Sequence, residues 1–155
     1  MRGLEDKARQ YALKLLSYRG RSVGELEKRL RRKGFPDHVV SSTIRHLKHI
    51  GLLDDKALAE ALKREAMTTK LLGQYGARKF MLGRDISREI IDSMFISDEK
   101  EDIENAQRLV DKKLRIMEGL PAEKIKRRLY NLLLRKGYSF ETIESVLKKR
   151  NFKED

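Results

Sequence analysis

The chain has 155 residues, and 36 Lys and Arg against 24 Asp and Glu give it a formal net charge of +12. The absence of cysteine excludes a disulfide framework, a thiolate zinc site and a cysteine nucleophile, and no apolar run approaches the ~20 residues that a membrane span needs. We therefore expect a soluble, cytoplasmic protein whose excess positive charge faces a polyanion or an acidic protein surface.

Apolar residues recur at helical spacing through the first third of the chain. The stripe over residues 4–16 predicts a first helix. Ser22 and Glu25 have the spacing of a capping box, so a second helix is expected over 22–34, where a glycine closes it. A third helix is expected over 36–51, because proline suits the start of a helix.

The rest of the chain repeats this arrangement. The segment 73–76 contains two glycines and is predicted to be a turn before a short helix around Phe80 and Met81. Five other stripes predict helices near 54–62, 87–94, 97–119, 121–136 and 139–147.

Three segments mark an internal repeat, namely 30–35, 81–86 and 133–138. Each is expected to end a helix with a cation, a turn residue and an apolar residue, and they lie about fifty residues apart. One module of this size is marginally stable alone, so neighbouring modules must stack. We predict an all-α fold of three tandem three-helix repeats that form an elongated helical-repeat protein. The expected repeats span residues 1–53, 54–96 and 97–155.

Several of these segments, taken in order, resemble the RecX family of bacterial regulators of the RecA recombinase. The segments that carry the resemblance are 26–35, Gly-Leu-Leu-Asp-Asp at 51–55, 73–86 and Arg-Lys-Gly-Tyr at 135–138. The resemblance implies three tandem three-helix repeats and negative regulation of RecA, without a cofactor, in recombination, DNA repair and the SOS response. Asp85 stands where the family usually has glycine. Asp54 and Asp55 are expected to cap a helix, and the resemblance implies that their element fixes the join between modules.

Positive charge is concentrated in the first expected repeat, where residues 1–53 carry a net charge of +8, against +1 for 54–96 and +3 for 97–155. We expect basic residues in two clusters to bind single-stranded DNA or an acidic surface of the RecA filament. The candidates in the first cluster are Arg19, Arg21, Lys28, Arg29, Arg31, Arg32, Lys33, Arg45 and Lys48. The second cluster, which begins at Lys124, supplies Lys126, Arg127, Arg128, Arg135 and Lys136.

Other kinds of site are not supported by the sequence. His46 and His49 share a helix face but have no well-placed third ligand, so no metal site is expected. No set of residues converges as an active site would require, and we predict no enzyme. Most aromatic residues, among them Phe80, Phe140 and Tyr138, have core spacing and not that of a base-stacking platform, whereas Tyr18 and Tyr75 are less clearly placed.

Two functions of different classes remain. The first is a monomeric RecX-like modulator that lies in the helical groove of a RecA–single-stranded DNA filament and inhibits filament growth, ATP hydrolysis and strand exchange. The second is a general helix-turn-helix-like nucleic-acid-binding protein, which short helices joined by glycine turns would also suit. Against the second, no helix carries a compact set of Asn, Gln and Arg suited to base edges.

Overall fold

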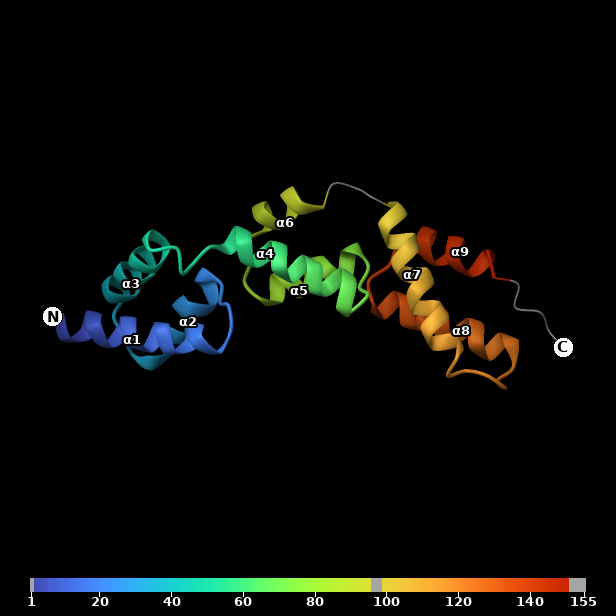
Figure 1. Ribbon diagram of the computed structural model, residues 1–155, viewed down its shortest axis with the longest axis horizontal. Coiled ribbons are helices and arrows are strands. Elements are labelled where there is room, and N and C mark those ends of the chain that lie inside the picture. The colour runs from blue at the N-terminus through green and yellow to red at the C-terminus, as the bar shows by residue number, and fades with distance from the viewer. Residues whose placement is uncertain (1, 96–98, 151–155) are drawn as a thin grey trace. The chain divides into compact units, whose positions relative to one another are not determined.

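The computed structural model describes residues 2–95 and 99–150, and all regular secondary structure in these ranges is helical (Figure 1), which confirms the all-α prediction. The helices are α1 (Arg2–Tyr18), α2 (Val23–Lys33), α3 (Asp37–His49), α4 (Asp55–Arg64), the π-helix η1 (Glu65–Thr69), α5 (Gln74–Gly83), α6 (Arg88–Met94), α7 (Glu99–Leu114), α8 (Ala122–Arg135) and α9 (Phe140–Lys148). The helix start predicted at Ser97–Asp98 lies outside the described residues.

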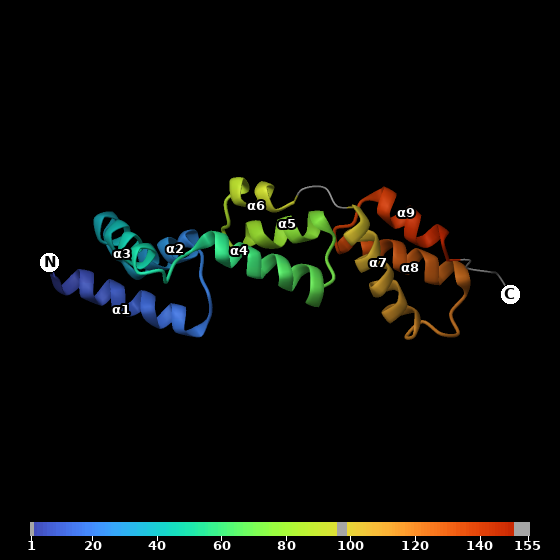
Figure 2. The same ribbon diagram turned by 45° about the horizontal axis from the view of Figure 1, so that its top comes forward.

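Helices α1, α2 and α3 pack against one another (Figures 1 and 2). Leu26 and Leu30 on α2 are fully buried, and they share one core with Ala12 of α1 and Leu47 of α3. The predicted capping box is present, since Ser22 Oγ accepts a hydrogen bond from the backbone N–H of Glu25, and Glu25 Oε1 accepts one from that of Ser22. Burial of each leucine contributes roughly 1.5–3 kcal/mol, so this face holds the group together.

Helices α7, α8 and α9 form a second packed group around Leu129, Leu133 and Val110, which are fully buried. Tyr138 is buried beside them, and its hydroxyl donates a 2.7 Å hydrogen bond to the backbone carbonyl of Leu71. This bond satisfies the one polar atom of the ring, which is what a buried tyrosine requires.

The three repeated segments end α2, α5 and α8 in the same way. In each, the last residue donates its backbone N–H to the carbonyl five residues earlier, at 3.1–3.2 Å, and the preceding residue is left-handed. The left-handed residues are Gly34 (φ 102°), Asp85 (φ 59°) and Gly137 (φ 87°). Aspartate is among the few residues that tolerate this region without glycine's freedom. The repeat seen in the sequence is therefore confirmed as a repeated helix ending.

The chain divides into two compact units, residues 1–61 with 81–91 and residues 62–80 with 92–155. Helices α4 and α5 each contribute residues to both units. The structure thus has the all-α helical-repeat fold that was predicted, whereas the repeat boundaries at 53/54 and 96/97 stay a prediction.

Within the first unit, two later segments hold the start of α2. The Asp55 carboxylate accepts a 2.9 Å hydrogen bond from the backbone N–H of Val23, the first residue of α2. Arg84 donates to the carbonyl of Gly20 at 2.8 Å and to the Glu25 carboxylate at 3.0 Å. We call these contacts the first joint. They agree with the implied role of the Gly-Leu-Leu-Asp-Asp element in fixing a join between modules.

The prediction that Asp54 and Asp55 cap a helix is confirmed, but the two residues cap different helices. Asp54 does cap α4, since its Oδ1 accepts from the backbone N–H of Ala57 at 3.1 Å. Asp55 caps α2, a helix more than twenty residues earlier in the chain. Sequence spacing reveals only local caps, and this one exists because packing brings the start of α4 to the start of α2.

Within the second unit, a corresponding second joint holds the start of α5. The Asp102 carboxylate of α7 accepts a 3.1 Å hydrogen bond from the backbone N–H of Gln74, and the N–H of Gly73 donates to the carbonyl of Lys136 at 2.9 Å. Gly76 lies directly against the backbone of Lys136 and Gly137, where no side chain fits.

The second joint explains why the prediction of a turn at 73–76 is wrong. Helix α5 begins at Gln74 and includes Gly76 in its first turn. Glycine normally weakens a helix, but here it allows close backbone contact, while Asp102 satisfies an N–H that the helix start leaves unpaired.

Candidate functional site

The first set of candidate residues, here the N-terminal basic cluster, lies on α2, on α3 and before α2. Its members are Arg19, Arg21, Lys28, Arg29, Arg31, Arg32, Lys33, Arg45 and Lys48. All are exposed or half-buried, so their charges reach the surface. The structure separates those neutralised by carboxylates of this chain from those that are not.

Three members of the N-terminal basic cluster form ion pairs within the chain. Arg19 pairs with Glu25 at 3.4 Å, and Lys28 pairs with Asp85 at 3.0 Å. Arg31 lies 3.2 Å from the Asp37 carboxylate and also contacts Glu27. Exposed pairs of this kind are worth little in stability, typically ~0.2–1 kcal/mol, but they lower the positive charge offered to a partner.

Arg29, Arg32 and Lys33 form no ion pair with any carboxylate in the part of the chain that the structure describes. Their i, i+3, i+4 spacing places them on one side of α2. Lys33 also lies 5.3 Å from the ring centre of Tyr11, a cation–π contact that orients its side chain. These three residues, the free basic face of α2, are the strongest binding candidates in the N-terminal basic cluster.

The start of α2 concentrates several charges around Glu25. Burial, followed by the like charges of Arg19 and Arg29, lowers the pKa of Arg21. Burial alone would raise the pKa of Glu25, but hydrogen bonds from Arg84 and from the Ser22 N–H outweigh it and hold that pKa below its ordinary value. Glu25 is therefore ionised at neutral pH, and its carboxylate pairs with both Arg19 and Arg84.

The second set of candidates, here the C-terminal basic cluster, consists of Lys126, Arg127, Arg128, Arg135 and Lys136. Lys136 belongs to the second joint, because its ammonium donates to the carbonyl of Lys70 at 3.3 Å and its own carbonyl accepts from Gly73. The other four are exposed on α8. They face two ways, since Lys126 and Arg127 border a shallow depression with Tyr130, whereas Arg128 and Arg135 border a separate cleft.

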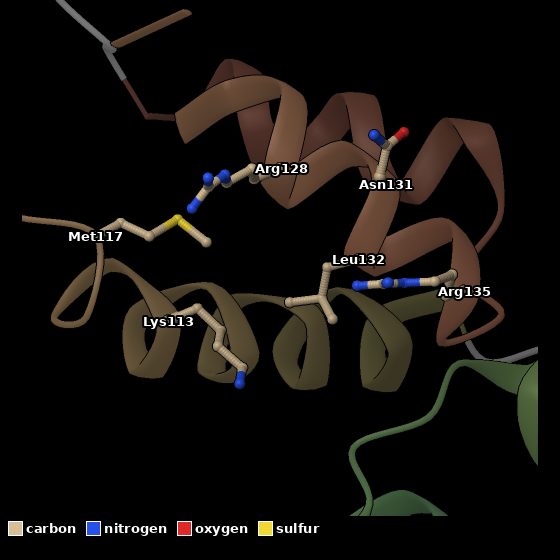
Figure 3. A pocket seen from close by; sticks show the side chains of 6 residues that line it. All are labelled: Lys113, Met117, Arg128, Asn131, Leu132 and Arg135. Atoms are coloured by element: carbon tan, nitrogen blue, oxygen red, sulfur yellow. The ribbon is translucent and has the colours of Figure 1, made fainter. Parts of the chain in front are cut away.

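This α7–α8 cleft has a volume of about 370 Å³ and is lined by Lys113, Met117, Arg128, Asn131, Leu132 and Arg135 (Figure 3). The guanidinium of Arg128 and the thioether of Met117 point toward one another, and the guanidinium of Arg135 turns back toward Leu132. Among the residues that the structure describes, no acidic side chain lines the cleft. It therefore combines positive charge with an apolar surface.

Two functional candidates escaped sequence reasoning. The sequence pattern predicts Arg84 only as part of a helix end, yet it anchors the first joint on Glu25. Lys113 lies in a mixed-charge stretch of α7, and only packing places it beside Arg128 and Arg135. The general rule that cations gather at a helix end would have drawn attention to Lys113, because it lies in the last turn of α7.

The expectation that the aromatic residues belong to the core is confirmed for Tyr138 and wrong for Phe140. Tyr138 is 3% exposed, but Phe140, the first residue of α9, is 64% exposed. A first-turn residue can lie outside the buried stripe that Ile143 and Leu147 continue, and helical spacing alone does not exclude this. Tyr18 and Tyr75 are also largely exposed.

Among the described residues, no group of three or more His, Asp or Glu side chains is placed to hold a metal ion. Likewise, none of the described helices combines the length and apolar character needed to cross a bilayer.

Comparison with known proteins identifies the family. The model of the first three-helix domain of RecX matches residues 8–47, and that of the third three-helix domain matches residues 99–147. The regulatory protein RecX of Mycolicibacterium smegmatis is 32% identical over 87% of this chain and 74% of its own length. The chain belongs to the RecX family. RecX of Mycobacterium leprae is 34% identical, with 92% of this chain and 85% of its own length covered.

Solved RecX structures have the same fold. The crystal structure of RecX from Lactobacillus salivarius superposes with a TM-score of 0.82 at 24% identity and covers 96% of this chain and 97% of its own. A second crystal structure of regulatory protein RecX gives a TM-score of 0.77 at 25% identity, with 94% and 72% covered. The family resemblance and the helical-repeat fold predicted from the sequence are thus both confirmed, and the chain is a regulatory protein of the RecX type.

Proposed function

We propose that this RecX protein is a negative regulator of the RecA recombinase, which binds along the groove of the RecA–single-stranded DNA filament. There it inhibits filament growth, ATP hydrolysis and strand exchange. It acts as a monomer in the cytoplasm, in DNA repair and the SOS response. Membership of the RecX family supports the regulatory role, and the distribution of positive charge supports a polyanionic or acidic partner.

The single observation that carries this proposal is the free basic face of α2. Arg29, Arg32 and Lys33 have no internal ion pair in the described ranges, although other cations of the same cluster do. A side chain whose charge no described carboxylate of this chain neutralises is available to a partner. The filament offers both DNA phosphates and acidic protein surface to such a face.

Inhibition in this proposal needs no catalytic residue. Several weak contacts on one chain reinforce one another, because each bound contact raises the effective concentration of the next. A protein held in the groove competes with incoming duplex DNA and blocks added protomers. RecA itself hydrolyses ATP, so the rate of ATP hydrolysis falls because RecA protomers leave the filament or are held fixed in it.

The test is RecA's DNA-dependent ATPase, measured with this protein at substoichiometric ratio. The variant Arg29→Ala/Arg32→Ala/Lys33→Ala removes three charges from α2 without touching its buried leucines, so we expect it to fold but to need a higher concentration for the same inhibition. The matched control is Lys7→Ala/Lys14→Ala/Lys56→Ala, which removes the same charge from exposed positions outside both basic clusters. We expect this control to inhibit like the original protein.

A parallel measurement of binding to bare single-stranded DNA identifies what the free basic face contacts. If it contacts phosphates, the slope of log affinity against log salt decreases by about 0.7 per lost contact. If it contacts acidic RecA side chains, binding to bare DNA stays the same while inhibition falls. A folded triple variant that still inhibits RecA at the original concentration would refute the role of this face. A protein that binds DNA without affecting RecA would favour the general nucleic-acid-binding alternative.

A further inference from the structure

The α7–α8 cleft has the composition of a ligand site. Three cations on two elements, Lys113 from α7 and Arg128 and Arg135 from α8, line a space of about 370 Å³, within the usual size range for small-ligand sites. None of the three pairs with a carboxylate in residues 2–95 and 99–150. Their mutual repulsion would be relieved by a bound anion.

The cleft also has surfaces that a simple anion would not use. Met117 and Leu132 are half-buried and line it beside the two guanidinium groups (Figure 3). Asn131 lies on α8 between Arg128 and Arg135, and its amide can both donate and accept hydrogen bonds. Guanidinium groups bind phosphate with two parallel hydrogen bonds and also stack on flat rings. An anion that carries a flat, partly apolar ring satisfies all of these groups.

We propose that the α7–α8 cleft binds one nucleotide of single-stranded DNA. Its phosphate lies on Arg128 and Arg135, with Lys113 adding charge, and its base lies against Met117 and Leu132. This site adds a specific DNA contact to the proposed function. It rests on that function only for where the single-stranded DNA comes from. A free nucleotide offers the same chemistry, so the experiment separates these two sources.

The methionine methyl groups provide a local probe in the full-length chain. The protein has five methionines, and Met117 lines the cleft while Met67 and Met81 are buried elsewhere. In a ¹³C-methyl NMR spectrum, assigned with Met117→Leu, we expect added (dT)8 to shift the Met117 signal and leave Met67 and Met81 in place. We expect dTMP to do so only at higher concentration, and an abasic octamer or inorganic phosphate to shift Met117 much less.

Charge-matched variants separate the cleft from general attraction to a basic protein. Arg128→Gln/Arg135→Gln removes two charges from the cleft, whereas Arg108→Gln/Lys112→Gln removes two from exposed positions of α7 that do not line it. The two arginines share one phosphate, and loss of that contact, at about 0.7 decade, predicts a roughly 5-fold weaker (dT)8 affinity at 0.1 M salt. We expect the affinity of the α7 control for (dT)8 to fall less than that of the cleft variant. We expect Asn131→Asp to weaken (dT)8 binding with no change in fold.

The possible outcomes are distinct. A Met117 signal that does not respond to (dT)8 overturns the proposal, as does an equal response to abasic DNA, phosphate or an oligoglutamate peptide. If dTMP binds as tightly as (dT)8, the cleft stands with the free nucleotide as its ligand. RecA inhibition is measured on the same samples. A shifted Met117 without inhibition leaves the cleft intact and refutes the proposed function, whereas inhibition without a shift refutes the cleft alone.

Discussion

At the scale of single residues, Glu25 connects local and tertiary structure. Its carboxylate completes the capping box with Ser22, and it also accepts a 3.0 Å hydrogen bond from Arg84, 59 residues away in the sequence. Both side chains are mostly buried, with 13% and 16% exposed. Charged hydrogen bonds with this degree of burial are among the stronger polar contacts in proteins.

Replacement of Glu25 by Gln should therefore destabilise the protein at neutral pH by about 1–3 kcal/mol, because the variant leaves Arg84 without its charged partner. Urea unfolding at pH 7 measures this loss. The control is Glu27→Gln, because Glu27 has only a 3.8 Å contact with the exposed Arg31, and it should change stability by a few tenths of a kcal/mol.

The same substitution should alter the pH dependence of stability. Since the pKa of Glu25 is lower in the folded protein than its ordinary value near 4.5, its charge stabilises the fold fully above pH 4.5. That contribution is lost as the pH falls through the lower, folded-state pKa. The Gln variant cannot titrate, so its stability should fall less steeply with acid in this window. Equal slopes for the two proteins would contradict the assignment.

At the scale of helices, burial follows the apolar stripe closely. Neighbouring positions on α8 illustrate this, because Leu133 is fully buried whereas Leu134 is 38% exposed. A rotation of about 100° between adjacent residues is enough to move a side chain from the core to the surface. The stripe on α8 thus fixes which side packs on α7 and α9, and which side carries its arginines.

Leu133→Ala should consequently lower the free energy of unfolding by about 2–5 kcal/mol, since it leaves a cavity in the core. Leu134→Ala is the matched control, and it should cost well under half as much because its side chain is already partly in water. Thermal or urea denaturation measures both. Similar losses in the two variants would show that the buried face of α8 has been assigned incorrectly.

At the scale of the whole molecule, the two joints repeat one design. In each, a carboxylate from the start of a later helix caps an earlier helix, and the left-handed helix ending of a later segment packs against that same helix start. Asp55 and Asp85 do this at α2, and Asp102 and Gly137 do it at α5. Internal repeats therefore extend to the contacts between helix groups within each unit.

Gly76→Ala tests the second joint. A Cβ at this position would meet the carbonyl of Lys136, which belongs to the backbone and cannot rotate away. We expect a loss of about 1–3 kcal/mol or more from this overpacking. Gly83→Ala, on the same helix but with no atom within 4 Å of the added methyl group, should be neutral or slightly stabilising. Circular dichroism during urea unfolding gives both values, and equal stability of the two variants would contradict close packing at Gly76.

The sequence by itself determined the helices, the repeat and the buried leucines. These features depend on interactions within a few residues, such as the capping box at Ser22 and the left-handed ends at Gly34 and Gly137, or on apolar periodicity along one helix. The family could also be predicted, because its motifs combine these local features. Interactions between residues close together in the chain can therefore be predicted from the sequence.

Only the tertiary structure decided which polar groups meet. It assigned Asp55 to α2, started α5 at Gln74, and paired Lys28 with Asp85, so that the free basic face of α2 is smaller than the cluster in the sequence. It also brought Lys113 beside Arg128 in a cleft. Ion pairs and clefts arise between segments far apart in the chain, and their formation depends on how the apolar faces pack, which spacing within any one segment does not specify.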